Sequence, residues 1–246
     1  MSTPSATDPQ VEVLPDATRL AAHVARRRLE RLVGAQVDEE VPQIVLTGGS
    51  IADAIHHEVA RLAPEYPVDW SRVEVWWGDE RFVSPDSPDR NAGQARLALL
   101  DPLRVPPGRV HEIPATDQAL DVDAAASAYS AQLRTCGPGE FDLVMLGVGP
   151  DGHVASLFPG HPAAEVADEL ATGVRDSPKP PPERVSLTFA TLNRSRAVWF
   201  LVAGPEKAQA VALALAGEVA LPAARVQGRL ETRWLVDESA AGLTQL

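Results

Sequence analysis

Five short apolar runs, each rich in β-branched or aromatic residues, constrain the fold of this chain most strongly. Their sequences are QIVLT (43–47), RVEVWW (72–77), FDLVMLG (141–147), AVWFLVA (197–203) and RWLVD (233–237). Strands this apolar are typical of parallel sheets that are covered on both faces. Helical patterns over residues 16–33, 50–62, 90–100, 121–135 and 204–217 precede the first run or lie between runs. We therefore expect an α/β fold, a Rossmann-like, mostly parallel sheet with helices on both faces.

The domain organisation follows from length and composition. With 246 residues, of which 45% are hydrophobic, the chain can bury a substantial core. It has no internal repeat and no change of composition that would mark a boundary, so residues 11–246 are expected to form a single α/β domain. Residues 1–10, MSTPSATDPQ, lack the basic and apolar segments of a secretory signal and are expected to be a disordered tail.

The expected compartment is the cytoplasm. No stretch of about 18 apolar residues is present to cross a membrane. The one cysteine, Cys136, excludes an intramolecular disulfide, fits a reducing compartment and is expected to be partly buried. The proline-rich stretch SPKPPPE (177–183) is expected to be a stiff connecting loop, because proline-rich loops commonly serve as spacers; a polyproline ligand for a partner is the alternative.

The net charge of the chain argues against polyanionic partners. The chain carries 22 Lys and Arg against 34 Asp and Glu, a formal charge of −12 without a basic block, which argues against nucleic acid and anionic membranes. An anionic metabolite is still possible where cations and backbone N–H groups gather locally. Because ligands of open α/β sheets bind outside the carboxyl ends of the strands, the residues that follow each run are the candidates.

Two of these strand ends offer groups that bind anions. Gly48, Gly49 and Ser50 follow the first run and lead into a helix, an arrangement that suits phosphate; a tight turn with Ser50 as helix N-cap is the plain alternative. Lys207 lies in the first turn of the helix after the fourth run, where its charge opposes the helix dipole unless an anion intervenes. Arg184 is a third candidate cation, with exposure to solvent as its alternative.

The second strand end is densely charged. WWGDERFVSPDSPDRN carries Asp79, Arg81 and Asn91 among other polar residues. A solvated loop is one interpretation, but Arg81 at the strand exit could pair with a phosphate, a carboxylate or a developing oxyanion.

The third strand end, GVGPDGHVASLFPG, contains a Gly-x-Gly-x-x-Gly pattern that raises the question of a dinucleotide site. Asp151, Gly152 and His153 stand where the helix of such a site should begin, which argues against it. A histidine oriented by a carboxylate suits general-base chemistry on water; a structural histidine is the alternative. No His-x-x-x-His spacing occurs, so a bound metal is not expected.

Taken together, these segments resemble the 6-phosphogluconolactonase family, whose relatives include the glucosamine-6-phosphate deaminases. The matching segments are LTGGS, WWGDERFV with DSPDRN, FDLVMLGVGPDGHVASLFPG, RVSLTFATLNRSRAVWFLVAGPEKAQAV and RWLVDESAA, collinear from about residue 43 to residue 240. After Asp-Gly-His the deaminases continue toward Ala-Phe-Asn-Glu, whereas this chain continues Ala-Ser-Leu-Phe-Pro-Gly, which favours the lactonase. The glycines then shape a turn that presents Asp151 and His153, and the dinucleotide pattern is accidental.

The resemblance implies hydrolysis of 6-phospho-D-glucono-1,5-lactone in the oxidative pentose phosphate pathway, without metal or organic cofactor. His153 is expected to be the general base, Arg81 the oxyanion stabiliser and Asp151 the residue that orients His153 or a sugar hydroxyl. The expected substrate-binding residues are Gly48, Gly49, Ser50, Asp79, Asn91, Gly152, Arg184 and Lys207. A monomer or a weak homodimer is expected.

Two positions depart from the family pattern, and two other functions remain open. Ile51 and Ala52 stand where the family often has Thr-Pro, which removes a hydroxyl contact or leaves it to Ser50. Arg90 stands where the family often has Ser, either to help hold the phosphate or to face solvent. An amino-sugar phosphate deaminase or isomerase would need an acid that is not found after His153. A sugar-phosphate sensor would usually carry a DNA-binding module, for which there is no room.

Overall fold

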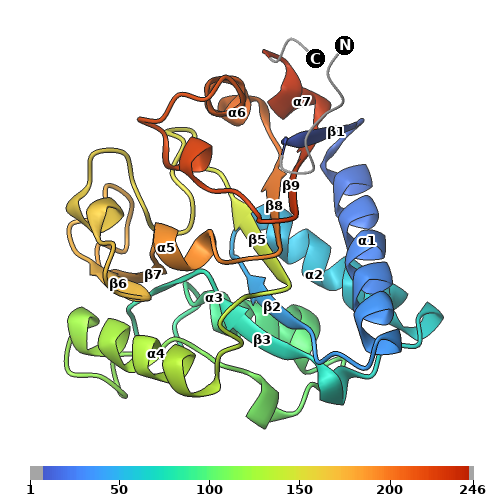
Figure 1. Ribbon diagram of the computed structural model, residues 1–246, viewed down its shortest axis with the longest axis horizontal. Coiled ribbons are helices and arrows are strands. Elements are labelled where there is room, and N and C mark those ends of the chain that lie inside the picture. The colour runs from blue at the N-terminus through green and yellow to red at the C-terminus, as the bar shows by residue number, and fades with distance from the viewer. Residues whose placement is uncertain (1–7, 244–246) are drawn as a thin grey trace.

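A six-stranded parallel sheet forms the centre of the protein (Figure 1), as the computed structural model shows for residues 8–243. Its strand order is β1-β9-β8-β5-β2-β3. The strands span Gln10–Leu14 (β1), Gln43–Leu46 (β2), Glu74–Trp77 (β3), Leu143–Gly147 (β5), Ala197–Val202 (β8) and Glu231–Asp237 (β9). All five apolar runs are therefore strands of one parallel sheet, which confirms the expected fold class.

The sixth strand, β1, was not expected. It pairs in parallel with β9, with Val11 opposite Trp234 and Val13 opposite Val236. Its residues are exposed or half-buried, as in an edge strand, and it lacks the continuous apolar run of the interior strands. Gln10, the last residue of the expected tail, begins this strand, and residues 1–7 of that tail lie outside the described residues.

A second, three-stranded sheet is antiparallel and has the order β4-β7-β6. Its strands span Asp79–Arg81 (β4), Ala171–Val174 (β6) and Arg184–Leu187 (β7). Strand β4 follows β3 after Gly78 alone, so the chain passes directly from the parallel sheet into the antiparallel one. This sheet carries Asp79, Arg81 and Arg184 next to the carboxyl ends of the parallel strands.

Helices cover both faces of the parallel sheet. They span Ala17–Val37 (α1), Ser50–Leu62 (α2), Asn91–Ala95 (α3), Val122–Cys136 (α4), Phe189–Leu192 (α5), Ala208–Leu215 (α6) and Glu238–Ala241 (α7). In Figure 1, α1 and α2 lie to the right of the strands, and α4, α5 and the β6–β7 pair lie to the left. The expected helix over 90–100 consists of α3 followed by a π-helical turn, Arg96–Leu100. None of the described helices is both long and apolar enough to cross a membrane.

One continuous hydrophobic core joins sheet and helices. Trp76 and Trp77 on β3 are fully buried, and the hydroxyl of Tyr129 on α4 donates to the Trp77 carbonyl and accepts from its N–H, both at 3.0 Å. Both backbone groups of Trp77 thus find a partner where the sheet ends. Cys136, expected to be partly buried, is exposed at the last turn of α4, so that expectation was wrong.

Candidate active site

A cavity of about 370 Å³ opens at the carboxyl ends of β2, β5 and β8, where the fold predicts a ligand site. Nine of the residues expected from the sequence line it: Gly48, Gly49, Ser50, Asp79, Arg81, Asn91, His153, Arg184 and Lys207. Asp151 and Gly152 do not line it. The four strand ends that were separate in sequence therefore meet at one cavity.

The turn after β2 presents the N-terminus of α2 to this cavity. Gly49 occupies the N-cap position with φ of 97°, a left-handed conformation that favours glycine, and no described side chain bonds to the free amides there. The alternative of Ser50 as N-cap is wrong, because Ser50 is the first residue of the helix. The first N–H groups of α2 are left for a ligand, and the helix dipole favours an anion.

A chain of hydrogen bonds fixes Arg81 at the cavity wall. Its Nη1 donates to Asn91 Oδ1 at 2.6 Å and to the Asp89 carbonyl at 2.8 Å, and Asn91 Nδ2 donates to the Asp79 carbonyl at 3.0 Å. The Asn91 amide also lies so close to Gly48 that a Cβ there would overlap it. Gly48 is thus required for the approach of Asn91, and Asn91 orients Arg81.

Glu80 and Arg90 are buried and fix the backbone of the loop that follows β4. Glu80, 1% exposed, accepts hydrogen bonds at 2.8 Å from the backbone N–H groups of Arg81, Asn91 and Ala92. Burial raises the pKa of Glu80, although Arg90 and these N–H groups oppose that shift. Arg90 is 2% exposed and donates to the Ile113 carbonyl. Both expectations for Arg90, phosphate ligand or solvent-facing cation, are wrong, because its charge lies inside the protein.

Asp151 and His153 form a hydrogen-bonded pair. The Nδ1 of His153 lies 2.6 Å from Asp151 Oδ1, and the imidazole lines the cavity. Burial raises the pKa of Asp151, but the hydrogen bond and charge of His153, with Lys179 nearby, outweigh burial and lower it to about 2. Asp151 is therefore ionised at neutral pH, and an Asp carboxylate on Nδ1 leaves Nε2 as the nitrogen that can accept a proton.

Two further contacts place the remaining loop residues. Asp79 Oδ2 accepts a hydrogen bond at 2.7 Å from the buried hydroxyl of Ser156, which follows the Asp-Gly-His loop. Gly152 has φ of 79°, and a Cβ there would meet the side chain of Leu221. Gly152 thus shapes the loop at a distance from the cavity wall.

The only two lysines in the chain, Lys179 and Lys207, both line this cavity. Lys179 Nζ lies 3.8 Å from Asp151 Oδ1, and Lys207 Nζ lies 4.0 Å from Glu206 Oε1. Burial and the neighbouring charge of Lys179 lower the pKa of Lys207. Lys179 lies in the proline-rich stretch and is not among the residues expected from the sequence; the scarcity of lysine is the signal that would have found it.

Arg184 holds the proline-rich stretch against the cavity. It is 5% exposed, its Nε donates to the Pro181 carbonyl at 3.1 Å, and its Nη2 donates to the carbonyls of Lys179 at 3.0 Å and Pro180 at 3.1 Å. Burial lowers the pKa of Arg184, with the charge of Asp79 opposing the shift. The stretch is thus a fixed loop that contributes Lys179 and Pro180 to the cavity wall.

The described part of the chain contains no set of side chains that could bind a metal ion. Within residues 8–243, no group of three or more His, Cys, Asp and Glu side chains is placed to hold a metal ion. The groups that line the cavity include the His153 imidazole, whose Nδ1 is held by Asp151, the guanidinium groups of Arg81 and Arg184, two ammonium groups and the start of a helix.

Known proteins are similar to this chain in sequence and in fold along nearly its whole length. The family model of glucosamine-6-phosphate isomerases/6-phosphogluconolactonase matches residues 15–234. The 6-phosphogluconolactonase of Streptomyces coelicolor is 44% identical and that of Mycobacterium tuberculosis 42% identical, each alignment covering at least 94% of both chains. The crystal structure of 6-phosphogluconolactonase from Thermotoga maritima superimposes with a TM-score of 0.83 at 30% identity, covering 93% of this chain and 99% of that one. This chain belongs to the glucosamine-6-phosphate isomerase/6-phosphogluconolactonase family.

Proposed function

We propose that this protein hydrolyses 6-phospho-D-glucono-1,5-lactone to 6-phospho-D-gluconate. The observation that carries the proposal is that His153, held by Asp151, lines the same cavity as Arg81 and both lysines of the chain. A base, an oxyanion site and a phosphate site are the three elements that hydrolysis of a phosphorylated lactone requires. The relatives of 42–44% identity named above are lactonases of this kind.

His153 acts as the general base. Its Nε2 takes a proton from a water molecule as the water oxygen attacks the lactone carbonyl carbon, and Asp151 on Nδ1 stabilises the resulting imidazolium. When the carbonyl re-forms, the bond from that carbon to the ring oxygen breaks. The imidazolium then gives its proton to the departing oxygen, which becomes the hydroxyl of the open-chain acid.

Arg81 stabilises the negative charge that develops on the carbonyl oxygen. Asn91 and the Asp89 carbonyl hold its Nη1, so the guanidinium does not have to reorganise during the reaction. Asp79 lines the cavity with one carboxylate oxygen held by Ser156, and it contacts the sugar.

The phosphate binds between the start of α2 and the two lysines. The free N–H groups after Gly49, the Ser50 hydroxyl and the ammonium groups of Lys179 and Lys207 all border the cavity. Two ammonium groups at one cavity repel each other, and a doubly charged phosphate removes that repulsion. Arg184 contributes by fixing the backbone of Lys179 as well as by lining the site.

Replacing either lysine is expected to weaken substrate binding selectively. Lys207→Ala and Lys179→Ala should each raise KM for the phosphorylated lactone about ten- to a hundredfold, since a hydrogen bond to a charged group is worth about 1.5–3 kcal/mol, with a smaller change in kcat. Steady-state kinetics on the phosphorylated lactone and on unphosphorylated gluconolactone measures this. Equal losses on both substrates would remove the lysines from the phosphate site.

A methyl group at Gly149 is expected to disrupt the catalytic pair. The Cβ of Gly149→Ala would overlap His153 Nδ1 and Asp151 Oδ1, so the pair must move or break its hydrogen bond. Misplacement of about 1 Å costs about 10²-fold in rate, and we expect a loss of that size in kcat. Gly108→Ala is the control, because a Cβ there has no neighbour within 4 Å. Full activity of Gly149→Ala would show that the geometry of the pair is not critical.

The test of the proposed reaction is direct observation of lactone opening. Freshly generated 6-phosphogluconolactone is followed by NMR with and without the protein, the spontaneous reaction is subtracted, and glucosamine 6-phosphate serves as the control for ammonia release. We expect rapid lactone loss and no ammonia. Lactone opening at the spontaneous rate would refute the proposal, and release of ammonia would indicate a deaminase.

A further inference from the structure

A second site is indicated by Arg28, a buried arginine on α1. Its side chain is 0% exposed, and its Nε, Nη1 and Nη2 all lack a hydrogen-bond partner within the described residues. An isolated buried charge is among the most costly features a protein can contain, and such charges normally pair or bind an ion.

No protonation change removes this charge at neutral pH. Burial lowers the pKa of Arg28 only to about 9, so the guanidinium stays charged. The nearby His56 on α2 is 5% exposed, and burial together with the charge of Arg28 lowers its pKa to about 3. His56 is therefore neutral and supplies no opposite charge.

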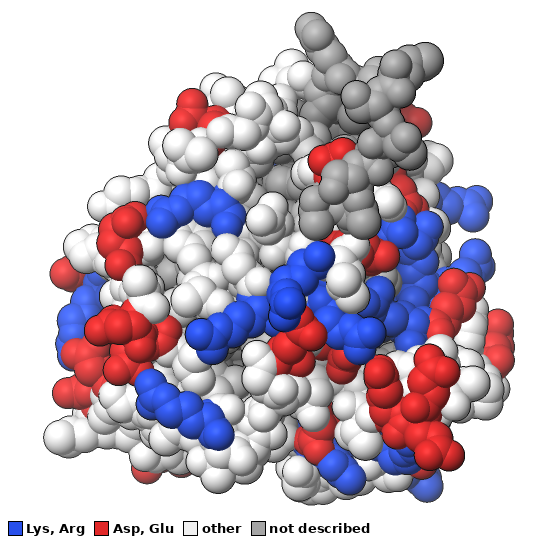
Figure 2. All heavy atoms as spheres, in the orientation of Figure 1, with Lys and Arg blue, Asp and Glu red and all other residues white. Residues whose placement is uncertain are grey.

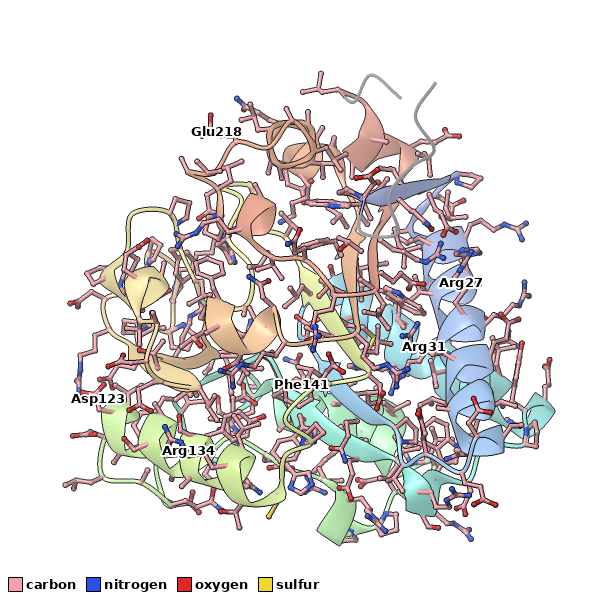
Figure 3. All side chains as sticks on the ribbon, viewed as in Figure 1. Arg27, Arg31, Asp123, Arg134, Phe141 and Glu218 are labelled. Atoms are coloured by element: carbon pink, nitrogen blue, oxygen red, sulfur yellow. The ribbon has the colours of Figure 1, made fainter. Side chains whose placement is uncertain are left out.

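Arg28 forms part of the wall of a cavity of about 170 Å³. Arg31 and Leu32 of α1, the chain around Glu40, the starts of β2 and β5, and Arg196 before β8 complete that wall. These are the amino ends of the parallel strands, whereas the candidate active site lies at their carboxyl ends. In Figure 3, Arg31 lies on the side of α1 that faces the strands.

Three carboxylates and two further guanidinium groups line this cavity, and all of them except Asp38, which is exposed at the end of α1, have partners among the described residues. Arg196 Nη1 lies 3.4 Å from both Glu40 Oε1 and Asp142 Oδ1, and Asp142 Oδ2 also accepts from the Gln43 N–H at 2.8 Å. Arg31 donates to the Asp142 carbonyl at 3.1 Å and lies 3.5 Å from Glu231. Figure 2 shows basic side chains gathered in a band across the middle of this face toward α1. Among the three guanidinium groups of this cavity, that of Arg28 is the one without a counterion in the described part of the chain.

We propose that this cavity is an anion-binding site, separate from the catalytic one, which takes a small doubly charged oxyanion of the size of phosphate. The guanidinium nitrogens of Arg28 are covered in this structure, so the side chain turns toward the cavity to donate hydrogen bonds to the anion, which neutralises its charge. Because the cavity joins α1 to the first residues of β2 and β5, occupancy stabilises the folded protein.

The position of the anion is tested by diffraction from crystals of the full chain soaked in selenate, which has an anomalous signal. We expect one selenium peak within hydrogen-bond distance of the Arg28 guanidinium, in addition to any peak beside Lys207. Malonate in a second soak distinguishes a site for tetrahedral anions from one for carboxylates. The proposal would be overturned if selenium were found at the catalytic cavity alone and the Arg28 guanidinium contacted water or the carboxylate of Asp38 or Glu40.

Binding in solution is tested with Arg28→Met, which removes the charge and keeps the length of the side chain. Phosphate is titrated calorimetrically into the wild type, Arg28→Met and Arg26→Met, the last being a matched control because Arg26 is exposed on the same helix. We expect a phosphate site in the wild type and in Arg26→Met that is weakened at least tenfold in Arg28→Met. Equal phosphate binding by all three proteins would refute the site.

A thermal unfolding measurement separates binding from structural effects. Without anion, Arg28→Met should be at least as stable as the wild type, because it removes an uncompensated buried charge. With phosphate, Tm of the wild type should rise more than Tm of Arg28→Met. If Arg28→Met does not fold, Arg28→Lys is measured in its place. The proposal would be contradicted if phosphate raised Tm of the variant as much as Tm of the wild type and the selenate crystals showed an empty cavity.

Discussion

His153→Ala is expected to lower kcat for the phosphorylated lactone by about 10²- to 10⁴-fold, the usual contribution of a positioned general base. The imidazole lines the cavity and its Nδ1 is held by Asp151, so its loss removes the proton acceptor and leaves the phosphate site intact. The measurement is kcat from NMR or proton release, with spontaneous hydrolysis subtracted. His57→Ala is the control, since His57 is an exposed histidine on α2.

The pH profile gives an independent check on the same assignment. Because the pKa of Asp151 is lowered to about 2, that carboxylate stays ionised through the acid range in which the enzyme can be assayed. Loss of kcat/KM on acidification should therefore not arise from protonation of Asp151. Unchanged kcat in His153→Ala would show that another group is the base.

Arg81→Met is expected to lower kcat by about 10²- to 10³-fold, the cost of losing one preorganised donor to an oxyanion. The guanidinium is fixed by Asn91 and the Asp89 carbonyl, so it is positioned before the substrate binds. Asn91→Ala should produce a smaller loss of the same kind, because it frees the guanidinium without removing it. Arg72→Met, a change at a half-buried arginine whose guanidinium donates to the Glu40 carbonyl and does not line the cavity, controls for loss of charge.

The choice of substrate distinguishes an oxyanion role from a phosphate role for Arg81. An oxyanion donor affects phosphorylated and unphosphorylated lactones alike, and its loss appears mainly in kcat. If Arg81→Met raised KM for the phosphorylated lactone alone, Arg81 would belong to the phosphate site, beside Lys207.

The strands of the parallel sheet could be predicted because each is a local apolar run. Ile44, Val45 and Leu46 are all at most 1% exposed, and such continuous burial leaves a direct mark on composition. Strand β1 and the strands of the antiparallel sheet contain no such continuous apolar run. Strand β4 reads Asp-Glu-Arg, and it is a strand only because β7, about a hundred residues later, pairs with it.

The candidate site was predictable for a related reason. Parallel strands place their carboxyl ends at one edge of the sheet, so residues that follow different runs, such as Ser50, His153 and Lys207, must meet there. The roles of Arg90 and Arg184 were not predictable in the same way. Whether an arginine faces a ligand, a carboxylate or a backbone carbonyl depends on contacts that its own segment does not specify.

The sequence by itself determined the parallel α/β architecture and the strand ends that carry the chemistry, because both depend on local apolar runs and on chain order. Tertiary structure alone decided that Arg184 holds the proline-rich loop and brings Lys179 to the cavity. It alone also decided that Arg90 is paired inside the protein while Arg28 is left without a counterion. The physical reason is that burial and charge pairing are properties of residues distant in sequence, and the energy of a charge is set by whichever groups the fold brings next to it.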